Sequence, residues 1–184
     1  MKGELEPTNS PYAMAKISAI EIGRSMNKQY DHQIINLMPT NLYGPNDNFS
    51  ENESHVIPGI MHKMHTAKVN NDSNFKIWGS GKPLREFLYV DDLSSAIEYL
   101  LVNNINTDLL NVGSGEEISI LDLANKIKEV IGYEGSIELD HDKPDGNPRK
   151  LLDSSKINEL GWKSEISLVD GLKKTYSWYL DNIL

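Results

Sequence analysis

The sequence of 184 residues contains no cysteine, which excludes disulfide bonds, thiolate metal ligands and a thiol acting as nucleophile or base. It has no hydrophobic run near the length of a transmembrane span, and its first residues lack the charged-then-apolar pattern of a secretion signal. We therefore expect a cytoplasmic protein, and we predict no metal site. Positive charge is also scarce, because 18 Lys and Arg oppose 27 Asp and Glu and leave a formal net charge of −9. This balance argues against a nucleic-acid or anionic-membrane surface, so an anionic ligand would need a local group of cations.

Helical and extended patterns alternate along the chain, which predicts an α/β fold without internal repeats. Ser10 and Pro11 form a helix-start signal, with Ser10 as the expected cap, and apolar residues then recur at helical spacing to about Tyr30. A short buried strand is expected over 33–38, followed by a polar loop over 39–54 that is long enough to suggest a function. The remaining expected elements are strands at 75–78, 85–90, 109–113 and 136–140, a helix with Pro58 in its first turn, and helices at 91–101, 119–131, 154–160 and 168–180.

Tyr12 and Lys16 lie one helical turn apart near the start of the chain, so a helix would place both side chains on one face. A phenol is a weak acid with an ordinary pKa of about 10, and a neighbouring ammonium favours its phenolate, so the pair could exchange a proton during carbonyl chemistry. Taken alone, the spacing favours the simpler interpretation of two exposed helix residues. Only eleven residues precede Tyr12, too few for the strand, glycine-rich turn and helix that would cradle a dinucleotide.

The sequence contains six blocks of residues in a fixed order, and together they are far more specific than a single YxxxK motif. They read YAMAK at 12–16, MPTNLYGP at 38–45, SHVIP at 54–58, WGSG with REFL at 78–81 and 85–88, NVG at 111–113, and KPDGNPRK at 143–150. Together these blocks resemble the C-terminal part of the GDP-L-fucose synthase family, whose members are extended short-chain dehydrogenases/reductases. The resemblance covers essentially the whole chain. It implies the last parallel strands and helices of a Rossmann-like fold, together with a small α/β substrate-binding lobe.

The resemblance also implies two regions. Residues 1–55 would be a remnant of the Rossmann-like domain, residues 56–184 would be mainly the substrate-binding lobe, and the segment 85–115 would return to the sheet. The family's N-terminal dinucleotide-binding half, its catalytic serine and its second epimerisation base, a cysteine, are absent from this sequence. Without the leading strands, the strand at 33–38 would have unpaired edges, which predicts poor solubility or self-association.

The same resemblance implies the catalytic and cofactor-binding residues. Tyr12 would donate a proton to the sugar's C4 oxygen as NADP(H) delivers hydride, while Lys16 would hold the nicotinamide ribose and lower the pKa of the tyrosine. His55 would exchange protons at C3 and C5, a task that suits an imidazole with an ordinary pKa of about 6.5. For Thr40 and Leu42 individually, a turn that merely ends a strand remains an open alternative. The implied cofactor-binding residues are Tyr12, Lys16, Pro39, Thr40, Asn41, Leu42 and His55.

The substrate's diphosphate needs cations in a chain that is acidic overall. Lys63, Trp78, Arg85 and Asp145 match substrate-contact positions of the family, and Arg149 is a further cation that we add on charge alone. Trp78 would stack on the guanine or ribose, and Asp145 would accept hydroxyl groups. A core aromatic beside a glycine turn is nearly as good an interpretation of Trp78. Lys63 stands where relatives often carry arginine, and a lysine keeps the charge but loses the bidentate fork.

These observations leave two classes of function open. In the first, the chain is the C-terminal part of an NADPH-dependent GDP-L-fucose synthase that converts GDP-4-keto-6-deoxy-D-mannose to GDP-L-fucose, with little or no turnover alone. The family implies a homodimer, and a complementary N-terminal half would be a further partner. In the second, the chain is a non-catalytic nucleotide-sugar-binding or dimerisation module. A fragment of another nucleotide-sugar epimerase or reductase is a third hypothesis, against which the SHVIP and KPDGNPRK blocks argue.

Overall fold

The structure is a computed structural model that describes residues 3–5, 7–50 and 53–184. Helices and strands alternate along it, so the predicted α/β class is confirmed. Helix α1 (Ser10–Tyr30) follows a short 3-10 turn, η1 (Pro7–Asn9), and has Pro11 in its first turn as predicted. The predicted cap was wrong, because Asn9 occupies the N-cap position and Ser10 is already helical.

Eight short strands lie in the described part of the chain, and most of their pairings are parallel. They are β1 (Asn36–Pro39), β2 (Asn41–Tyr43), β3 (Asn74–Trp78), β4 (Leu84–Tyr89), β5 (Leu109–Val112), β6 (Glu117–Ser119), β7 (Ser136–Asp140) and β8 (Arg149–Lys150). Parallel pairs join β1 with β5, β2 with β4, and β3 with β7. Strand β4 also pairs with β6 in antiparallel and with β8 in parallel orientation. The sequence missed β2, β6 and β8, because strands of two or three residues are defined by their pairing rather than by a pattern.

Five further helices follow, namely α2 (Val56–Asn70), α3 (Val90–Val102), α4 (Ile120–Ile131), α5 (Ser155–Glu159) and α6 (Leu168–Asn182). Helix α2 has Pro58 in its first turn as predicted, and the other four begin and end within two residues of the predicted positions. The Ser119 hydroxyl accepts a hydrogen bond of 3.0 Å from the Asp122 N–H, which caps α4. None of the described helices is both long and apolar enough to cross a lipid bilayer.

Two buried apolar clusters stabilise different parts of the molecule. The larger cluster joins α2, α4 and α6 with β3 and contains Leu123 among its fully buried side chains. The smaller cluster lies around β5, α3 and α5 and contains Leu110 and Ile157. Helix α1 belongs to neither cluster, and Ile20 and Gly23 are the only buried positions in this fully described helix.

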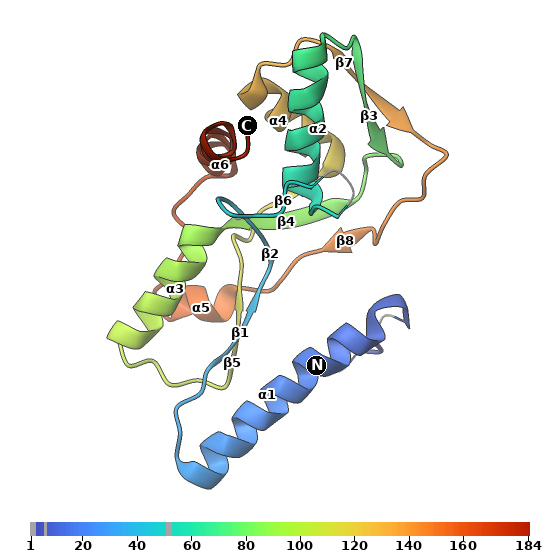
Figure 1. Cartoon of the computed structure of the whole chain (residues 1–184). Helices are drawn as coiled ribbons and strands as arrows, with labels where there is room; N and C mark the ends of the chain where they lie inside the picture. Colours follow the sequence, from blue (N-terminus) through green and yellow to red (C-terminus); the bar gives the residue numbers. More distant parts are fainter. Residues whose placement is uncertain (1–2, 6, 51–52) are drawn as a thin grey trace.

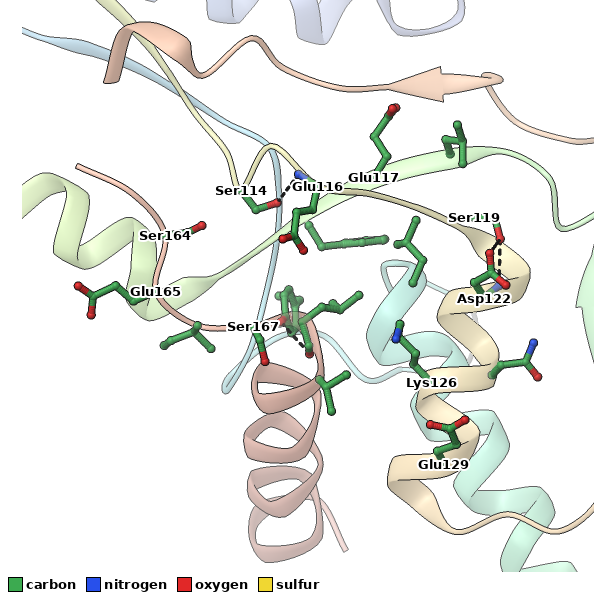
Figure 2. Close-up of a pocket in the computed structure, with 18 residues that line it drawn as sticks. Ser114, Glu116, Glu117, Ser119, Asp122, Lys126, Glu129, Ser164, Glu165 and Ser167 are labelled. Atoms are coloured by element: carbon green, nitrogen blue, oxygen red, sulfur yellow. Dashed lines mark hydrogen bonds between the residues drawn. The ribbon is translucent and has the colours of Figure 1, made fainter. Parts of the chain in front are cut away.

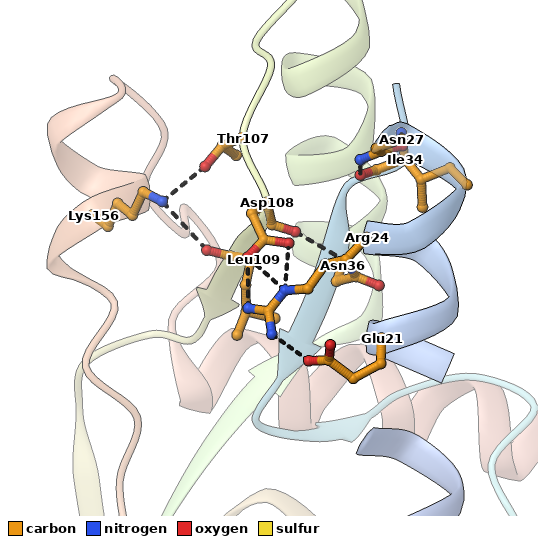
Figure 3. A network of polar contacts seen from close by, with 9 residues as sticks. All are labelled: Glu21, Arg24, Asn27, Ile34, Asn36, Thr107, Asp108, Leu109 and Lys156. Carbon is orange, nitrogen blue, oxygen red and sulfur yellow. Dashed lines mark hydrogen bonds and ion pairs between the residues drawn. The ribbon is translucent and has the colours of Figure 1, made fainter. Parts of the chain in front are cut away.

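Helix α1 lies along the outer side of β1 and β5, away from α2, α4 and α6 (Figure 1). Polar contacts attach its C-terminal half to the rest of the molecule (Figure 3). Nε of Arg24 donates to both carboxylate oxygens of Asp108, at 2.9 and 2.8 Å. The Asn27 side chain exchanges two hydrogen bonds of 2.8 Å with the backbone of Ile34. The helix is therefore attached at the start of β1 and at the loop before β5.

Candidate functional site

Five of the residues selected from the sequence meet in one open cleft. The cleft has a volume of about 360 Å³ and lies between the first half of α2, the turn after β3, the start of β4 and the loop that follows β7. Its lining includes His55, Lys63, Trp78, Arg85 and Asp145. The fold thus brings together side chains that are widely separated in the chain.

His55 and Lys63 project from one face of α2. His55 is the N-cap residue, and Gly59 and Lys63 follow at intervals of four residues, which aligns all three along the cleft. The His55 side chain is 80% exposed, and its Nδ1 lies 3.3 Å from a carboxylate oxygen of Asp47. When Nδ1 carries the hydrogen and donates it to Asp47, Nε2 is free to take up a proton.

Trp78 ends strand β3 with 66% of its surface exposed. Phe75 and Ile77 are buried in the same strand, so the two-residue period of side chains places Trp78 on the open face. This exposure excludes the alternative that Trp78 is a core residue. The ammonium groups of Lys63 and Lys143 lie 5.6 and 5.5 Å from the centroid of its ring. Both contacts are within cation–π distance, so a flat apolar surface and two positive charges occur together.

Asp145 is held in place by the turn after β3. Its carboxylate accepts hydrogen bonds from the Ser80 hydroxyl at 2.7 Å and from the Ser80 N–H at 2.8 Å. These bonds hold the pKa of Asp145 below its usual value, and the bond from the Ser80 hydroxyl contributes most. Gly79 has a φ of +77°, and a Cβ there would collide with the Asp145 carboxylate, so the turn requires glycine. An ionised carboxylate held in this way can accept further hydrogen bonds from hydroxyl groups.

Arg85 and Lys150 are partners in the register of β4 and β8. Nη1 of Arg85 donates to the carbonyl oxygens of Leu84 and Asn147, both at 2.7 Å, which fixes the guanidinium beside the cleft. Lys150 lines an adjoining cleft of about 390 Å³, which it shares with Arg85 and His55. Two cations on neighbouring strands therefore line the adjoining cleft, and Arg85 lines both clefts.

Arg149, the cation that we added on charge alone, lies elsewhere. Its guanidinium donates two hydrogen bonds of 2.7 Å to the carboxylate of Glu117. It lines a separate cavity that also contains Ser154. Because successive residues of a strand point to opposite sides, the structure favours Lys150 as the cation that accompanies Arg85. A role for Arg149 in substrate binding stays a prediction.

The segment predicted to bind the cofactor lies where β1 ends and β2 begins. Asn41 and Leu42 line the adjoining cleft beside His55. The side chains of Thr40 and Asn41 donate to the main-chain oxygen of Glu86, at 3.2 and 2.7 Å. The segment is thus held at the carboxyl end of β1, the edge at which open α/β sheets bind dinucleotides.

Tyr12 and Lys16 lie on α1, outside both clefts. The Lys16 ammonium is 5.3 Å from the centroid of the Tyr12 ring, so the two side chains share one helix face as predicted. Tyr12 is 60% exposed. Pro39, the last residue of β1, is also exposed and lines neither cleft. The structure keeps the Tyr–Lys pair together but does not join it to His55.

A larger cavity of about 820 Å³ lies between β6, α4 and the segment leading into α6 (Figure 2). Its charged lining is mainly acidic and consists of Glu116, Glu117, Asp122, Lys126, Glu129 and Glu165. Across the described ranges, no three carboxylates or histidines gather closely enough to hold a metal ion. Because carboxylates repel a diphosphate, the cleft around Arg85 is the better candidate for an anionic nucleotide.

Sequence reasoning missed three charged residues at the site, namely Asp47, Lys143 and Lys150. The alternation of side chains along a strand could have shown that Lys150 and Arg149 face different sides. Lys143 reaches Trp78 only because β3 pairs with β7, which brings the following loop beside the tryptophan. No pattern in the sequence connects Asp47 with a histidine eight residues later.

Known proteins share both the sequence and the fold of this chain. It is 50% identical over 183 residues to GDP-L-fucose synthase 1 of Arabidopsis thaliana, which covers 100% of this chain and 57% of that relative. It is 46% identical over 191 residues to the GDP-L-fucose synthase of Escherichia coli strain K12, covering 99% of this chain and 60% of that relative. A solved GDP-L-fucose synthetase from Naegleria fowleri bound to NADP has a TM-score of 0.90 at 30% identity, covering 99% of this chain and 59% of the other.

The chain therefore spans less than two thirds of the length of these relatives. Its residues 1–113, which include α1, β1, β2 and the cleft residues as far as Arg85, match the family model for NAD dependent epimerases and dehydratases. The chain belongs to the NAD dependent epimerase/dehydratase family.

Proposed function

We propose that the chain takes part in GDP-L-fucose synthesis, in which GDP-4-keto-6-deoxy-D-mannose is epimerised at C3 and C5 and reduced at C4. The observation that carries this proposal is the cleft in which the exposed Trp78 stands beside Lys63 and Arg85. The indole offers a stacking surface for guanine, and the two cations match a diphosphate. His55 lines both this cleft and the adjoining one, so it lies between the nucleotide end and the cofactor segment.

His55 is the group that exchanges protons with the keto sugar. An imidazole can take up and return a proton near neutral pH, and a C–H beside a carbonyl is acidic enough to need such a base. Asp47 orients the ring by accepting the hydrogen of Nδ1, which directs Nε2 toward the substrate. Epimerisation takes a proton from one face of each carbon and adds a proton to the opposite face, so the composition of the sugar is unchanged. His55 acts on one face, and the acid on the opposite face would come from the polypeptide that carries the dinucleotide-binding segment.

The cofactor of this proposal is NADP(H), whose nicotinamide end fits the Pro39–Leu42 segment because that segment ends a parallel strand beside His55. When bound, the cofactor supplies hydride to C4. Tyr12 donates the proton to the C4 oxygen, and the Lys16 ammonium stabilises the phenolate that remains. Both residues must face the sugar for this step. The reduction therefore requires α1 to lie with Tyr12 and Lys16 directed at the bound sugar.

We assign residues 1–55 to a Rossmann-like region and residues 56–184 mainly to a substrate-binding lobe, with 85–115 returning to the sheet. The parallel pairing of β1 with β5 and of β2 with β4 supports this assignment, since it connects the two regions.

The proposed partners are a second copy of the chain and a polypeptide that carries a dinucleotide-binding segment. The cytoplasm is the proposed location.

Nucleotide binding and turnover test the proposal separately. Calorimetry should show that the chain binds GDP, that Arg85→Met weakens this binding, and that Lys173→Met on the exposed side of α6 does not. Oxidation of NADPH by the keto sugar is then followed with the chain alone and with the dinucleotide-binding polypeptide added. Turnover that requires both polypeptides would support the proposal. Failure of the unmodified chain to bind GDP would overturn it.

A non-catalytic nucleotide-sugar-binding module is the second candidate function. It is favoured by the exposure of Tyr12 and by its separation from the cleft that contains His55. GDP binding without turnover, in the mixture as well as alone, would support this candidate against the first.

A further inference from the structure

Glu86 is a fully buried carboxylate in the middle of β4, between two residues that line the clefts, Arg85 and Phe87. Burial of a carboxylate is costly unless its oxygens accept hydrogen bonds. Oε1 of Glu86 accepts the N–H of Gly115 at 2.8 Å, and Oε2 accepts the N–H of Leu152 at 3.0 Å. One side chain therefore attaches the loop after β5 and the segment after β8 to the same strand.

The surroundings of Glu86 leave little freedom to this arrangement. A Cβ at Gly113 would collide with the Glu86 carboxylate, so the end of β5 packs directly on it. The main-chain oxygen of Glu86 also accepts hydrogen bonds from Thr40 and Asn41. The residue thus contacts the start of β2, the end of β5 and the segment after β8.

We propose that Glu86 is a positioning residue that sets the spacing of the two cations at the junction of the clefts. Lys150 is the register partner of Arg85 and lies two residues before Leu152. The hydrogen bond from the Leu152 N–H restrains β8 against β4 and so keeps Lys150 in register with Arg85, with both side chains lining the adjoining cleft. This inference rests on the proposed function, because the spacing matters for a ligand that carries a diphosphate.

The role requires two hydrogen-bond acceptors, which makes Glu86→Gln the diagnostic substitution. Glutamine has almost the same shape as glutamate, but its amide nitrogen is a donor and would face the N–H of Gly115 or Leu152. An N–H that faces a donor in place of a carboxylate oxygen loses its hydrogen bond, so the attached segment moves away from β4. The cations then lose their spacing, while Trp78 at the far end of β3 keeps its position.

The test compares GDP with guanosine, which has the same base and no phosphate. We expect Glu86→Gln to weaken GDP binding by about tenfold, from the loss of one charge-assisted hydrogen bond, and to leave guanosine binding unchanged. Binding is measured by calorimetry and by quenching of tryptophan fluorescence, with the melting temperature recorded for each variant. Ser154→Ala is the matched control, because its buried hydroxyl lies against Gly113 as well and has no hydrogen-bond partner among the described residues.

A double-mutant cycle tests whether Glu86 acts through Lys150. Lys150→Met should also weaken GDP binding alone, and adding Glu86→Gln to it should cause little further loss. Should Glu86→Gln not fold, Glu86→Asp carries the same test, because the shorter carboxylate cannot reach both N–H groups. Equal losses for GDP and guanosine, or fully additive losses in the cycle, would overturn the positioning role. If Glu86→Gln leaves GDP binding unchanged, the positioning role is overturned and the proposed function is not. If the unmodified chain does not bind GDP, both are overturned.

Discussion

The cleft and helix α1 carry two parts of the predicted chemistry, and the structure holds them by different means. The cleft residues stand on α2, β3 and β4, whose inner faces pack into the larger apolar cluster around Leu123. Helix α1 buries only Ile20 and Gly23, and hydrogen bonds of Arg24 and Asn27 attach it to the rest of the molecule. Apolar burial stabilises a fold far more than exposed ion pairs do. The binding groups are therefore preorganised by a core, whereas the position of Tyr12 depends on a few polar contacts.

Truncation of apolar side chains should give the largest difference between the two regions. We expect Leu123→Ala to lower the free energy of unfolding by about 2–5 kcal/mol, because the side chain is fully buried in the core beneath the cleft. Ile22→Ala on the exposed face of α1 should change it by less than about 0.5 kcal/mol. Urea denaturation measures both values. A large loss from Ile22→Ala would show that a second surface covers α1 in solution.

Nucleotide affinity should separate the two regions next. Trp78→Ala should weaken GDP binding by about 5- to 150-fold, since stacking of one base on an aromatic ring contributes about 1–3 kcal/mol. Tyr12→Phe should leave GDP affinity unchanged, because Tyr12 lies outside the cleft. Trp162→Phe controls for loss of a tryptophan, as Trp162 is buried in the smaller cluster. Weaker GDP binding by Tyr12→Phe would contradict the separation of the two regions.

The attachment of α1 should be visible in hydrogen exchange. Arg24→Gln removes the guanidinium that holds Asp108, so amides in α1 should exchange faster while those in α2 keep their protection. Lys28→Gln, in the last turn of the same helix, provides the control for a lost charge. High salt should weaken the same attachment in the unmodified chain. If α1 exchanges at the same rate in both variants, the ion pair does not hold the helix.

The smallest expected effect lies within the cleft. Ser80→Ala removes the hydroxyl that donates to Asp145, so the pKa of that carboxyl should rise toward its usual value. Because the pKa of Asp145 is lower in the folded state, its ionised carboxylate stabilises the folded protein at pH values above the unfolded pKa of about 3.9. This contribution is lost as the pH falls through the lower pKa of the folded state. NMR titration of the carboxyl carbons measures the change. Ser155→Ala is the matched control, because it should raise the pKa of Asp153 toward its usual value and leave the pKa of Asp145 unchanged.

Residues with a local signal were predictable, and those that depend on pairing were not. The helix that bears Tyr12 and the capped helix after Ser119 follow from spacing and capping, which act over one or two turns. Strands β2, β6 and β8 were missed because a strand of two or three residues exists only through its partner. The predicted cap at Ser10 failed by one residue, within the range over which helix ends differ.

The sequence by itself determined which reactive and binding groups the protein has. These are a tyrosine and a lysine on one helix face, a histidine at a helix start, and cations near a tryptophan, in a chain without cysteine. Tertiary structure decided which of these groups meet. It gathered His55, Trp78 and Arg85 in one cleft, turned Arg149 away toward Glu117, and left Tyr12 on an exposed helix. The reason is physical, because capping and side-chain spacing are local, whereas the meeting of side chains depends on strand register and on which faces the core buries.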